Sequence, residues 1–302
     1  MTLLAAVAGA SFVFLASATI ILFIVGPTMM LQPRRRGAEY YRALHQPVVP
    51  SDLHLAHEDF RLTAEDGITL EGWLIKSNHH ARGTVIYLHG VGDCKIDGLH
   101  FAKLLHDNNY NVVLYDSRRH GNSGGTYCTY GYYEKNDLIR VIDFVTSRPD
   151  LAVGSVGLFG TSMGAAVSLQ AAALDKRIAA VVAENSFATL RTIFDEYQKR
   201  MIKLPFHYLR NIVIKRSERL ARFKANEVSP LASVAAIHIP LLVIYGTHDR
   251  LINSKYSLML FEKANMPKEL YPVENASHTD TWEVAGEPYE QKLLEFFARN
   301  LT

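Results

Sequence analysis

The sequence predicts a doubly wound α/β domain built on a mostly parallel sheet. Short continuous apolar runs, such as residues 84–88 and 156–159, are typical of parallel strands that are buried on both faces. They alternate with amphipathic segments of helical period, which predicts β-α-β crossovers. A hairpin pattern at residues 58–75, with its turn centred on Asp66 and Gly67, precedes them and adds an antiparallel edge.

The order of the elements follows from the same patterns. Strand-like segments are expected at residues 83–90, 110–116, 156–159, 177–186, 239–249 and 268–278. Helix-like segments are expected at residues 98–109, 133–148, 165–174, 254–265 and 288–300. A long insertion at about residues 188–236 interrupts this alternation, and the domain as a whole is expected to cover residues 56–302.

The composition excludes several classes of protein. Hydrophobic residues make up 48% of the 302 residues and charged residues 21%, which is typical of a globular chain with a substantial core. The net charge of +2, without a basic stripe that carries aromatic residues, argues against a nucleic-acid partner. Cys94 and Cys128 are too few for a disulfide framework, and no Cys/His cluster has zinc-ligand spacing. We therefore expect no metal and no cofactor.

Residues 1–32 differ from the rest of the chain. No charged side chain occurs between Thr2 and Gln32, and about 20 apolar residues are enough to span a bilayer core. Three arginines, residues 34–36, follow at once, whereas a cleavable signal peptide carries its basic residues before a shorter apolar run. We expect a single-pass membrane anchor with the large domain on the cytoplasmic side. A signal peptide and a buried helix are the alternatives.

Residues 33–55 contain three prolines and show no sustained periodicity. Such a stretch is typical of a linker. We expect it to connect the anchor to the domain and to hold the domain away from the membrane.

Ser162 lies at the centre of a distinctive pattern. Residues 160–164, Gly-Thr-Ser-Met-Gly, fit G-x-S-x-G between a strand-like and a helix-like segment. The pattern is typical of a turn so tight that the serine is strained and small neighbours are needed to avoid backbone clashes. The N-terminus of the following helix favours negative charge that develops nearby. We predict that Ser162 is a nucleophile, and an ordinary glycine-rich turn is the alternative.

A serine hydroxyl is a weak nucleophile and needs a base. His278 ends the last strand-like segment, and Asp249 ends the one before it. Because the carboxyl ends of parallel strands meet at one edge of a sheet, these two residues are expected beside Ser162. Ser162 would attack, His278 would move the proton, and Asp249 would orient the imidazole.

Other side chains compete for these roles. Glu274 and Asp280 are weaker candidates for the acid. His248, beside Asp249, and His89 are expected to be structural.

An oxyanion hole needs two backbone donors. One is expected at the N–H of Met163, directly after Ser162. The other is expected in the loop after residues 83–90, where Gly90 and Gly92 allow a close backbone approach, and we choose the N–H of Val91. A simple turn at the end of the strand is the alternative for this loop.

Taken as a set, five stretches resemble the α/β-hydrolase superfamily. They are LHGVGD, YDSRRHGNSGG, LFGTSMGAA, YGTHDRLI and ENASH. The resemblance extends from about Glu58 to the C-terminus and is greatest to the single-pass, membrane-anchored serine hydrolases, close to the serine aminopeptidase-like and dienelactone hydrolase-like groups. It implies an α/β-hydrolase fold with a helical lid. It also implies that Arg118, His120 and Ser123 are scaffold at the rim of the site, and the serine at position 162 excludes the dehalogenase branch, which has aspartate there.

The insertion at about residues 188–236 lies where α/β-hydrolases carry a lid. Between Arg191 and Lys224 it has ten Lys or Arg and three acids, a local charge of +7, with apolar residues between them. Such a segment beside an anchor suggests contact with an anionic membrane surface and a lipid-like substrate. The alternative is a solvated cap whose apolar face covers the site.

The leading hypothesis is a serine hydrolase that cleaves carboxylic esters, with lipid-like esters and acyl thioesters included, through an acyl-enzyme on Ser162. A serine peptidase or aminopeptidase of the same fold is the second hypothesis. A non-catalytic scaffold tethered to the membrane is the third.

Overall fold

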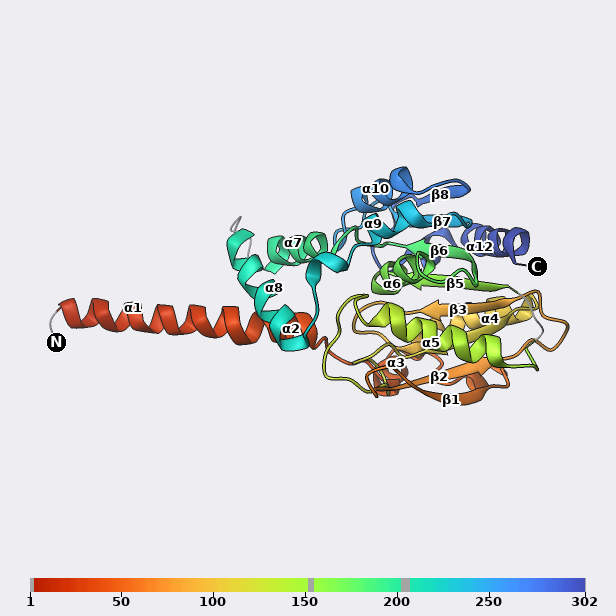
Figure 1. Cartoon of the computed structure of the whole chain (residues 1–302), viewed down its shortest axis with the longest axis horizontal. Helices are drawn as coiled ribbons and strands as arrows, with labels where there is room; N and C mark the ends of the chain where they lie inside the picture. The colour runs from red at the N-terminus through yellow and green to blue at the C-terminus, as the bar shows by residue number, and fades with distance from the viewer. Residues whose placement is uncertain (1–2, 152–154, 202–206, 302) are drawn as a thin grey trace.

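The computed structural model describes residues 3–151, 155–201 and 207–301, and an eight-stranded sheet lies at its centre (Figure 1). The strand order is β1-β2-β4-β3-β5-β6-β7-β8. The β1–β2 and β2–β4 pairs are antiparallel and all other neighbours are parallel, which confirms the predicted mixed sheet. The strands are β1 (Glu58–Thr63), β2 (Thr69–Ile75), β3 (Thr84–Leu88), β4 (Asn111–Tyr115), β5 (Val156–Thr161), β6 (Ile178–Glu184), β7 (Leu241–Gly246) and β8 (Lys268–Val273).

The burial of the strands follows their sequence patterns. Every residue of β3 and β4 is buried, as continuous apolar runs predict. β1 pairs only with β2 and buries one residue of its six, which is typical of an edge strand. The hairpin turn lies where it was predicted, because Gly67 has a φ of +83° and Ala64 exchanges backbone hydrogen bonds across the turn.

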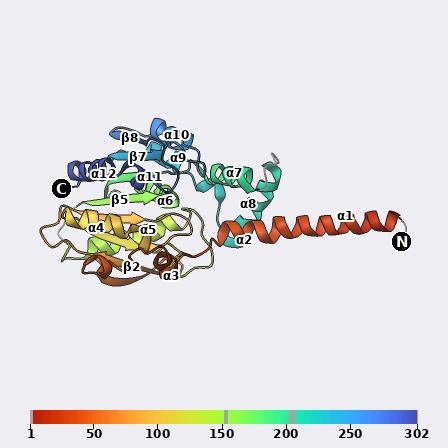
Figure 2. The same ribbon diagram turned by 180° about the vertical axis from the view of Figure 1, so that it is seen from behind.

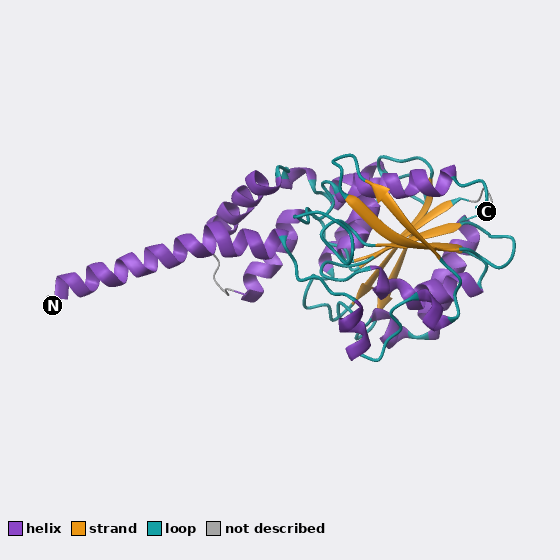
Figure 3. Cartoon of the chain, turned by 90° about the horizontal axis from the view of Figure 1, so that it is seen from below, coloured by secondary structure: helices purple, strands orange, loops and turns teal. Residues whose placement is uncertain are grey.

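Helices cover both faces of the sheet (Figures 1 and 3). α5 (Glu134–Ser147), α6 (Met163–Ala172) and α10 (Lys255–Lys263) pack in one layer of the core. α4 (Leu99–Asp107) and α12 (Glu287–Asn300) pack in the other. α11 (Thr281–Ala285) precedes α12. This two-layer arrangement places the carboxyl ends of the parallel strands at one end of the domain.

The insertion between β6 and β7 is helical. It contains α7 (Leu190–Met201), α8 (His207–Ala221) and the short α9 (Pro230–Ser233). Residues 202–206 of the predicted lid lie outside the described residues. Figure 1 shows α7 and α8 at the end of the domain from which the N-terminal helix projects.

The N-terminal apolar stretch forms one long helix that projects from the domain (Figure 2). It comprises α1 (Leu3–Ile20), a π-helical turn (Ile21–Val25) and α2 (Gly26–Leu31). The helix continues through Gly26-Pro27, and a π turn at this point fits a proline that cannot donate to the preceding turn. Within Ala5–Leu31 an 18-residue window has a mean hydropathy of 2.4, so the helix is long and apolar enough to cross a membrane. A signal sequence near an N-terminus has the same two properties.

The composition of residues 33–55 suggests a linker, but in the structure these residues fold against the domain. They contain α3 (Ala38–Ala43) and a 3-10 turn (Pro50–Leu53). Tyr41, Val48 and Leu55 are buried in the same core layer as α4 and α12. Burial of these apolar side chains against the domain outweighs the weak local preference of the stretch for regular structure.

Candidate active site

The tight turn between β5 and α6 holds Ser162 in a strained conformation. Its φ of 53° and ψ of −112° are unusual for a residue with a side chain. A Cβ on Gly164 would lie 2.0 Å from the carbonyl oxygen of Leu88, and a Cβ on Gly160 would lie 2.4 Å from the carbonyl carbon of Gly164. Only glycine therefore fits at either position, which is the physical basis of the G-x-S-x-G pattern.

The loops after β7 and β8 bring Asp249 and His278 to Ser162. Nδ1 of His278 lies 2.6 Å from a carboxylate oxygen of Asp249, and Nε2 lies 3.0 Å from Oγ of Ser162. The other oxygen of Asp249 accepts hydrogen bonds from the backbone N–H groups of Leu251 and Ile252 at 2.7 and 2.8 Å. The side chain of Asp249 is 1% exposed and that of His278 is 9% exposed. The three side chains therefore form one largely buried, hydrogen-bonded series.

The two competing acids do not reach His278 in this way. Asp280 accepts a hydrogen bond from the backbone N–H of Ser277 at 2.6 Å, and Glu274 accepts one from the hydroxyl of Thr247 at 3.3 Å. Asp280 stabilises its own loop and Glu274 joins the loops after β7 and β8, so Asp249 is the carboxylate that orients the imidazole.

Two residues at the end of β6 also support the site. The backbone N–H of Ser162 donates to the carbonyl of Glu184 at 2.8 Å. Asn185, with a φ of 50°, donates from its side chain to the carbonyl of His278 and accepts from the N–H of Gly246, each at 3.0 Å. Glu184 and Asn185 lie at the end of the strand-like segment predicted at residues 177–186. The sequence does not predict a role for either, because hydrogen bonds between a side chain and a distant backbone group leave no pattern in the chain.

The side chain of Glu184 is a second buried carboxylate near the site. Burial raises its pKa above the ordinary value for glutamate, while hydrogen bonds from the hydroxyls of Thr281 and Tyr289 partly offset this. It thereby ties α11 and α12 to the strand end beside Ser162.

The two residues predicted to supply oxyanion donors lie on either side of the turn at Ser162. Met163 is the first residue of α6. Val91 is half-buried in the loop after β3, and a Cβ on its neighbour Gly90 would lie 3.5 Å from Cβ of Ser162. The backbone of this loop therefore lies against the serine.

The loop after β4 contains the three residues expected to be scaffold. The guanidinium of Arg118 pairs with Asp137 at 2.6 Å and Asp66 at 2.8 Å. Oγ of Ser123 donates to the carbonyl of Asp116 at 2.6 Å and accepts from the N–H of Glu71 at 2.9 Å. These contacts join the loop to β2 and α5.

Two buried histidines, one in the loop after β3 and one in the loop after β4, lie with their ring centres 5.1 Å apart. Nε2 of His89 accepts from the N–H of Ser117 at 3.0 Å, and Nδ1 of His120 lies 2.8 Å from the carbonyl of Arg118. Burial lowers the pKa of His89, and burial together with His89 lowers the pKa of His120 to about 3. Both imidazoles are therefore neutral and structural. His248 is exposed, and its Nδ1 lies 3.3 Å from the hydroxyl of Thr247.

The surface of the insertion is strongly basic. Within residues 191–200 and 207–224, where side-chain exposure is described, every exposed Lys, Arg, Asp or Glu is a lysine or an arginine: Arg191, Lys199, Arg200, Lys215, Arg219, Arg222 and Lys224. The acids of the segment are half-buried and engaged. Asp195 pairs with Arg210, Glu196 pairs with Lys199 at 3.2 Å, and Glu218 accepts from the backbone N–H of Ala225 at 2.8 Å.

α8 also packs against the base of the N-terminal helix. A Cβ on Gly26 would lie 2.9 Å from a methyl group of Val213, so the two helices approach closely at a residue without a side chain. Oγ of Ser217 lies 3.5 Å from Sδ of Met30. The insertion is therefore in direct contact with the candidate membrane span.

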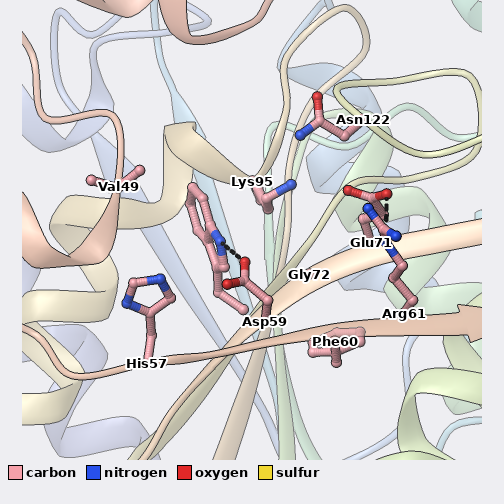
Figure 4. A pocket seen from close by; sticks show the side chains of 10 residues that line it. Val49, His57, Asp59, Phe60, Arg61, Glu71, Gly72, Lys95 and Asn122 are labelled. Carbon is pink, nitrogen blue, oxygen red and sulfur yellow. Dashed lines mark hydrogen bonds and ion pairs between the residues drawn. The ribbon is translucent and has the colours of Figure 1, made fainter.

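A cavity of about 650 Å³ lies elsewhere, along β1 and β2 (Figure 4). None of its lining residues belongs to the series Asp249–His278–Ser162. Its polar groups pair with nearby side chains: Arg61 with Glu71 at 3.0 Å, Trp73 with Asp59 at 3.0 Å, and Lys95 with Asp116 at 2.6 Å. Geometry and chemistry therefore place the candidate active site at Ser162.

Comparisons with known proteins agree with this fold. The protein YqkD of Bacillus subtilis (strain 168) is 32% identical over 243 residues, which cover 78% of each chain. The α/β-hydrolase domain-containing protein WAV2 of Arabidopsis thaliana is 25% identical over 264 residues, with 84% of this chain and 82% of WAV2 covered. The structure of the Pyrococcus furiosus esterase Pf2001 is similar with a TM-score of 0.73 and 27% identity, covering 90% of this chain and 98% of the esterase.

One family model matches half of the chain. It is described as serine aminopeptidase, S33, and it matches residues 79–229, which extend from the strand before the loop at Val91, through the turn at Ser162, into the helical insertion. The chain therefore belongs to the serine aminopeptidase S33 family of α/β-hydrolases.

Proposed function

We propose that the chain is a serine hydrolase that cleaves carboxylic esters through an acyl-enzyme on Ser162. The observation that supports this most directly is the series Asp249–His278–Ser162, with distances of 2.6 and 3.0 Å. Nδ1 of His278 carries the hydrogen, because the carboxylate of Asp249 can only accept. Nε2 then presents its lone pair to the hydroxyl of Ser162, as proton abstraction requires.

In the proposed reaction, Oγ of Ser162 attacks the ester carbonyl carbon while its proton passes to Nε2 of His278. The carbonyl π electrons move onto oxygen, and this oxyanion accepts hydrogen bonds from the N–H groups of Met163 and Val91. Collapse of the tetrahedral intermediate breaks the bond to the alcohol oxygen, which takes the proton from His278. Water then attacks the acyl-enzyme by the same steps and releases the carboxylic acid.

Two observations favour esters over peptides with a free N-terminus. The similar Pyrococcus furiosus protein Pf2001, 98% of whose chain is covered, is an esterase. The exposed charges of the insertion within residues 191–200 and 207–224 are basic, and these disfavour an ammonium group near the site. The family description names an aminopeptidase, so an aminopeptidase is the second candidate.

We also propose that the substrate is lipid-like, or carries an acyl chain, and is met at an anionic membrane surface. The helix Ala5–Leu31 would span the bilayer, and the three arginines after it favour a domain on the cytoplasmic side. α8 contacts the base of this helix, so its exposed cations lie near the membrane. Each Lys or Arg near an anionic surface contributes about 1 kcal/mol of attraction.

A substrate panel tests the reaction class. The full chain in detergent is given p-nitrophenyl esters of increasing acyl length, the matching thioesters and aminoacyl p-nitroanilides. We expect ester turnover with an initial burst of nitrophenol close to one equivalent per site, because acylation by an activated ester is faster than hydrolysis of the acyl-enzyme. Faster turnover of the anilides would replace the proposal with the aminopeptidase. No turnover of any substrate would favour the non-catalytic scaffold.

A second experiment tests the membrane surface. Lys215→Glu with Arg219→Glu should slow hydrolysis of a long-chain ester in nanodiscs of anionic lipid severalfold, and leave hydrolysis of a short soluble ester unchanged. Lys176→Glu, an exposed charge reversal in the loop before β6, is the matched control. Equal rates for the double variant and the wild type in anionic nanodiscs would contradict a role for the basic insertion.

A further inference from the structure

We propose that residues 30–41, here called the juxtamembrane segment, position the loop that carries Val91, and that Arg36 is the positioning residue at its centre. The inference rests on the proposed function, because it concerns the oxyanion hole of that reaction. It adds a role to a stretch that the sequence suggests is only a linker.

The juxtamembrane segment holds the second half of the loop at several points. The backbone N–H of Arg36 donates to the carbonyl of Gly92 at 3.1 Å. The guanidinium of Arg36 pairs with the carboxylate of Asp93, and the hydroxyl of Tyr41 donates to the same carboxylate at 3.1 Å. The guanidinium also lies 4.6 Å from the centre of the Tyr40 ring. Gly92 and Asp93 are therefore fixed from outside the loop.

The first half of the same loop lies against the nucleophile. A Cβ on Gly90 would be 3.5 Å from Cβ of Ser162. The N–H of Asp93 donates to the carbonyl of Gly90 at 3.3 Å, which closes a turn around Val91 and Gly92. Because the turn links these two ends, a displacement of Asp93 moves the N–H of Val91 relative to Ser162. Misplacement by 1 Å is enough to lower a catalytic rate about a hundredfold.

Charge explains why an arginine is needed at position 36. Asp93 lies near Asp97, a half-buried acid that accepts a hydrogen bond from the hydroxyl of Tyr87 at 2.5 Å. Burial and the neighbouring Asp93 raise the pKa of Asp97 to about 7, and Arg36 acts in the opposite direction. Arg36 thus offsets the repulsion between two carboxylates. Without it, Asp93 loses its cationic partner, and fewer contacts hold the turn at Val91.

The start of the segment also reaches the side of the site that carries Met163. The carbonyl of Leu31 accepts from the N–H of Cys128 at 2.8 Å, and Sγ of Cys128 lies 3.4 Å from Sδ of Met163. The hydroxyl of Tyr130 donates to the carbonyl of Met30 at 3.1 Å. The segment that leads out of the candidate membrane span is therefore attached near both predicted donors.

The test uses the full chain in detergent with a short soluble ester, so that delivery of substrate from a membrane plays no part. Arg36→Ala and Arg36→Lys are compared with Arg42→Ala, the same loss of charge at an exposed residue just outside the juxtamembrane segment. Rates are normalised to the number of sites that a fluorophosphonate labels at completion. Affinity is also measured for a trifluoromethyl ketone, which forms an oxyanion when the serine adds to it.

We expect Arg36→Ala to lower kcat roughly tenfold with KM within about twofold, below the 10²–10³ that loss of a whole oxyanion donor costs. The trifluoromethyl ketone should bind more weakly by a similar factor. Arg36→Lys should recover part of both losses, because it restores the charge, and Arg42→Ala should match the wild type. A merely structural role would lower the number of labelled sites and leave kcat per site unchanged.

The outcomes separate this inference from the proposed function. The inference alone would be overturned if the wild type is active and Arg36→Ala keeps the wild-type kcat and ketone affinity. A change in KM alone would also overturn it. A wild-type chain that turns over no ester would overturn the proposed function and the inference with it. If Arg36→Ala does not fold, Tyr41→Phe removes one hydrogen bond to Asp93 and keeps the ring. It should lower kcat at least twofold, and an unchanged kcat would overturn the inference.

Discussion

The turn at Ser162 and the turn at Val91 lie side by side but are held in place differently. The first is fixed by its own strand and helix, because any side chain at Gly160 or Gly164 would meet backbone atoms. The second is held by Arg36, which precedes its partner Asp93 by 57 positions. The nucleophile is thus set by local packing, whereas the loop beside it depends on the segment that leads out of the N-terminal helix. Changes at the two turns should therefore differ in size and in kind.

The largest expected effect is at the series that serves Ser162. Asp249→Asn should lower kcat about 10⁴-fold, because an amide nitrogen facing Nδ1 favours the tautomer that cannot accept the serine proton. Ester turnover per folded site is the measurement. His248→Ala, an exposed histidine next in sequence, is the control and should behave like wild type. An Asp249→Asn enzyme within tenfold of wild type would remove Asp249 from the proposed site.

The next effect tests the self-contained packing of the turn at Ser162. Gly164→Ala should destabilise the domain by about 3 kcal/mol, because its Cβ would lie 2.0 Å from the carbonyl of Leu88 and α6 must shift. Denaturant unfolding measures the loss. At Gly37, where the backbone is extended and a Cβ meets nothing within 4 Å, the same substitution should change stability by less than about 0.5 kcal/mol. Equal stability of the two variants would contradict the comparison.

A smaller effect distinguishes the loop at Val91 from an ordinary turn. Gly92 and Gly67 have φ values of +84° and +83°, so alanine at either should cost about 1–2 kcal/mol of stability. Gly92→Ala should also lower kcat, since the backbone strain arises in the loop that carries Val91. Gly67→Ala, in the β1–β2 turn, should leave kcat unchanged. Loss of kcat in both variants would mean that stability alone controls the rate.

The smallest effect concerns pH. Because burial keeps the pKa of His120 near 3 while the unfolded chain titrates near 6.5, the unfolded state binds more protons as the pH falls. The free energy of unfolding therefore keeps its full value above pH 6.5 and falls below that pH. His120 accounts for about 1 kcal/mol of this loss at pH 6. His120→Asn should reduce the difference in stability between pH 7.5 and pH 6, and His248→Ala should not. The same difference in wild type and His120→Asn would show that His120 does not carry it.

The sequence predicts the parts of this fold that depend on local pattern. The buried strands appear as continuous apolar runs, and Ser162 and Asp249 each follow one. His278 follows the half-buried strand-like segment at residues 268–278, so the meeting of the three at one edge of the sheet could be predicted. Their catalytic roles, and those of Met163 and Val91, stay predictions until activity is measured. The attachment of residues 33–55 could not be predicted, because it depends on contacts such as that of Tyr41 with Asp93, which leave no periodicity in a stretch rich in proline.

The support at the end of β6 was missed for a related reason. Glu184 contributes a backbone carbonyl to Ser162, and Asn185 bonds to the backbone of another loop. Neither interaction needs a spacing that a single sequence reveals. The π-helical turn that carries the N-terminal helix into Gly26-Pro27 is likewise not predicted by the sequence, because a proline normally marks a helix boundary.

The most direct test of Ser162 as the nucleophile is covalent labelling of the full chain with a fluorophosphonate, followed by mass spectrometry of the labelled peptide. We expect one label per chain on Ser162 in the wild type and none in Ser162→Ala. Ser147→Ala, an exposed serine at the end of α5, should label like wild type. A wild-type chain that takes no label, or a Ser162→Ala chain that labels as well as wild type, would contradict the claim that Ser162 is the nucleophile.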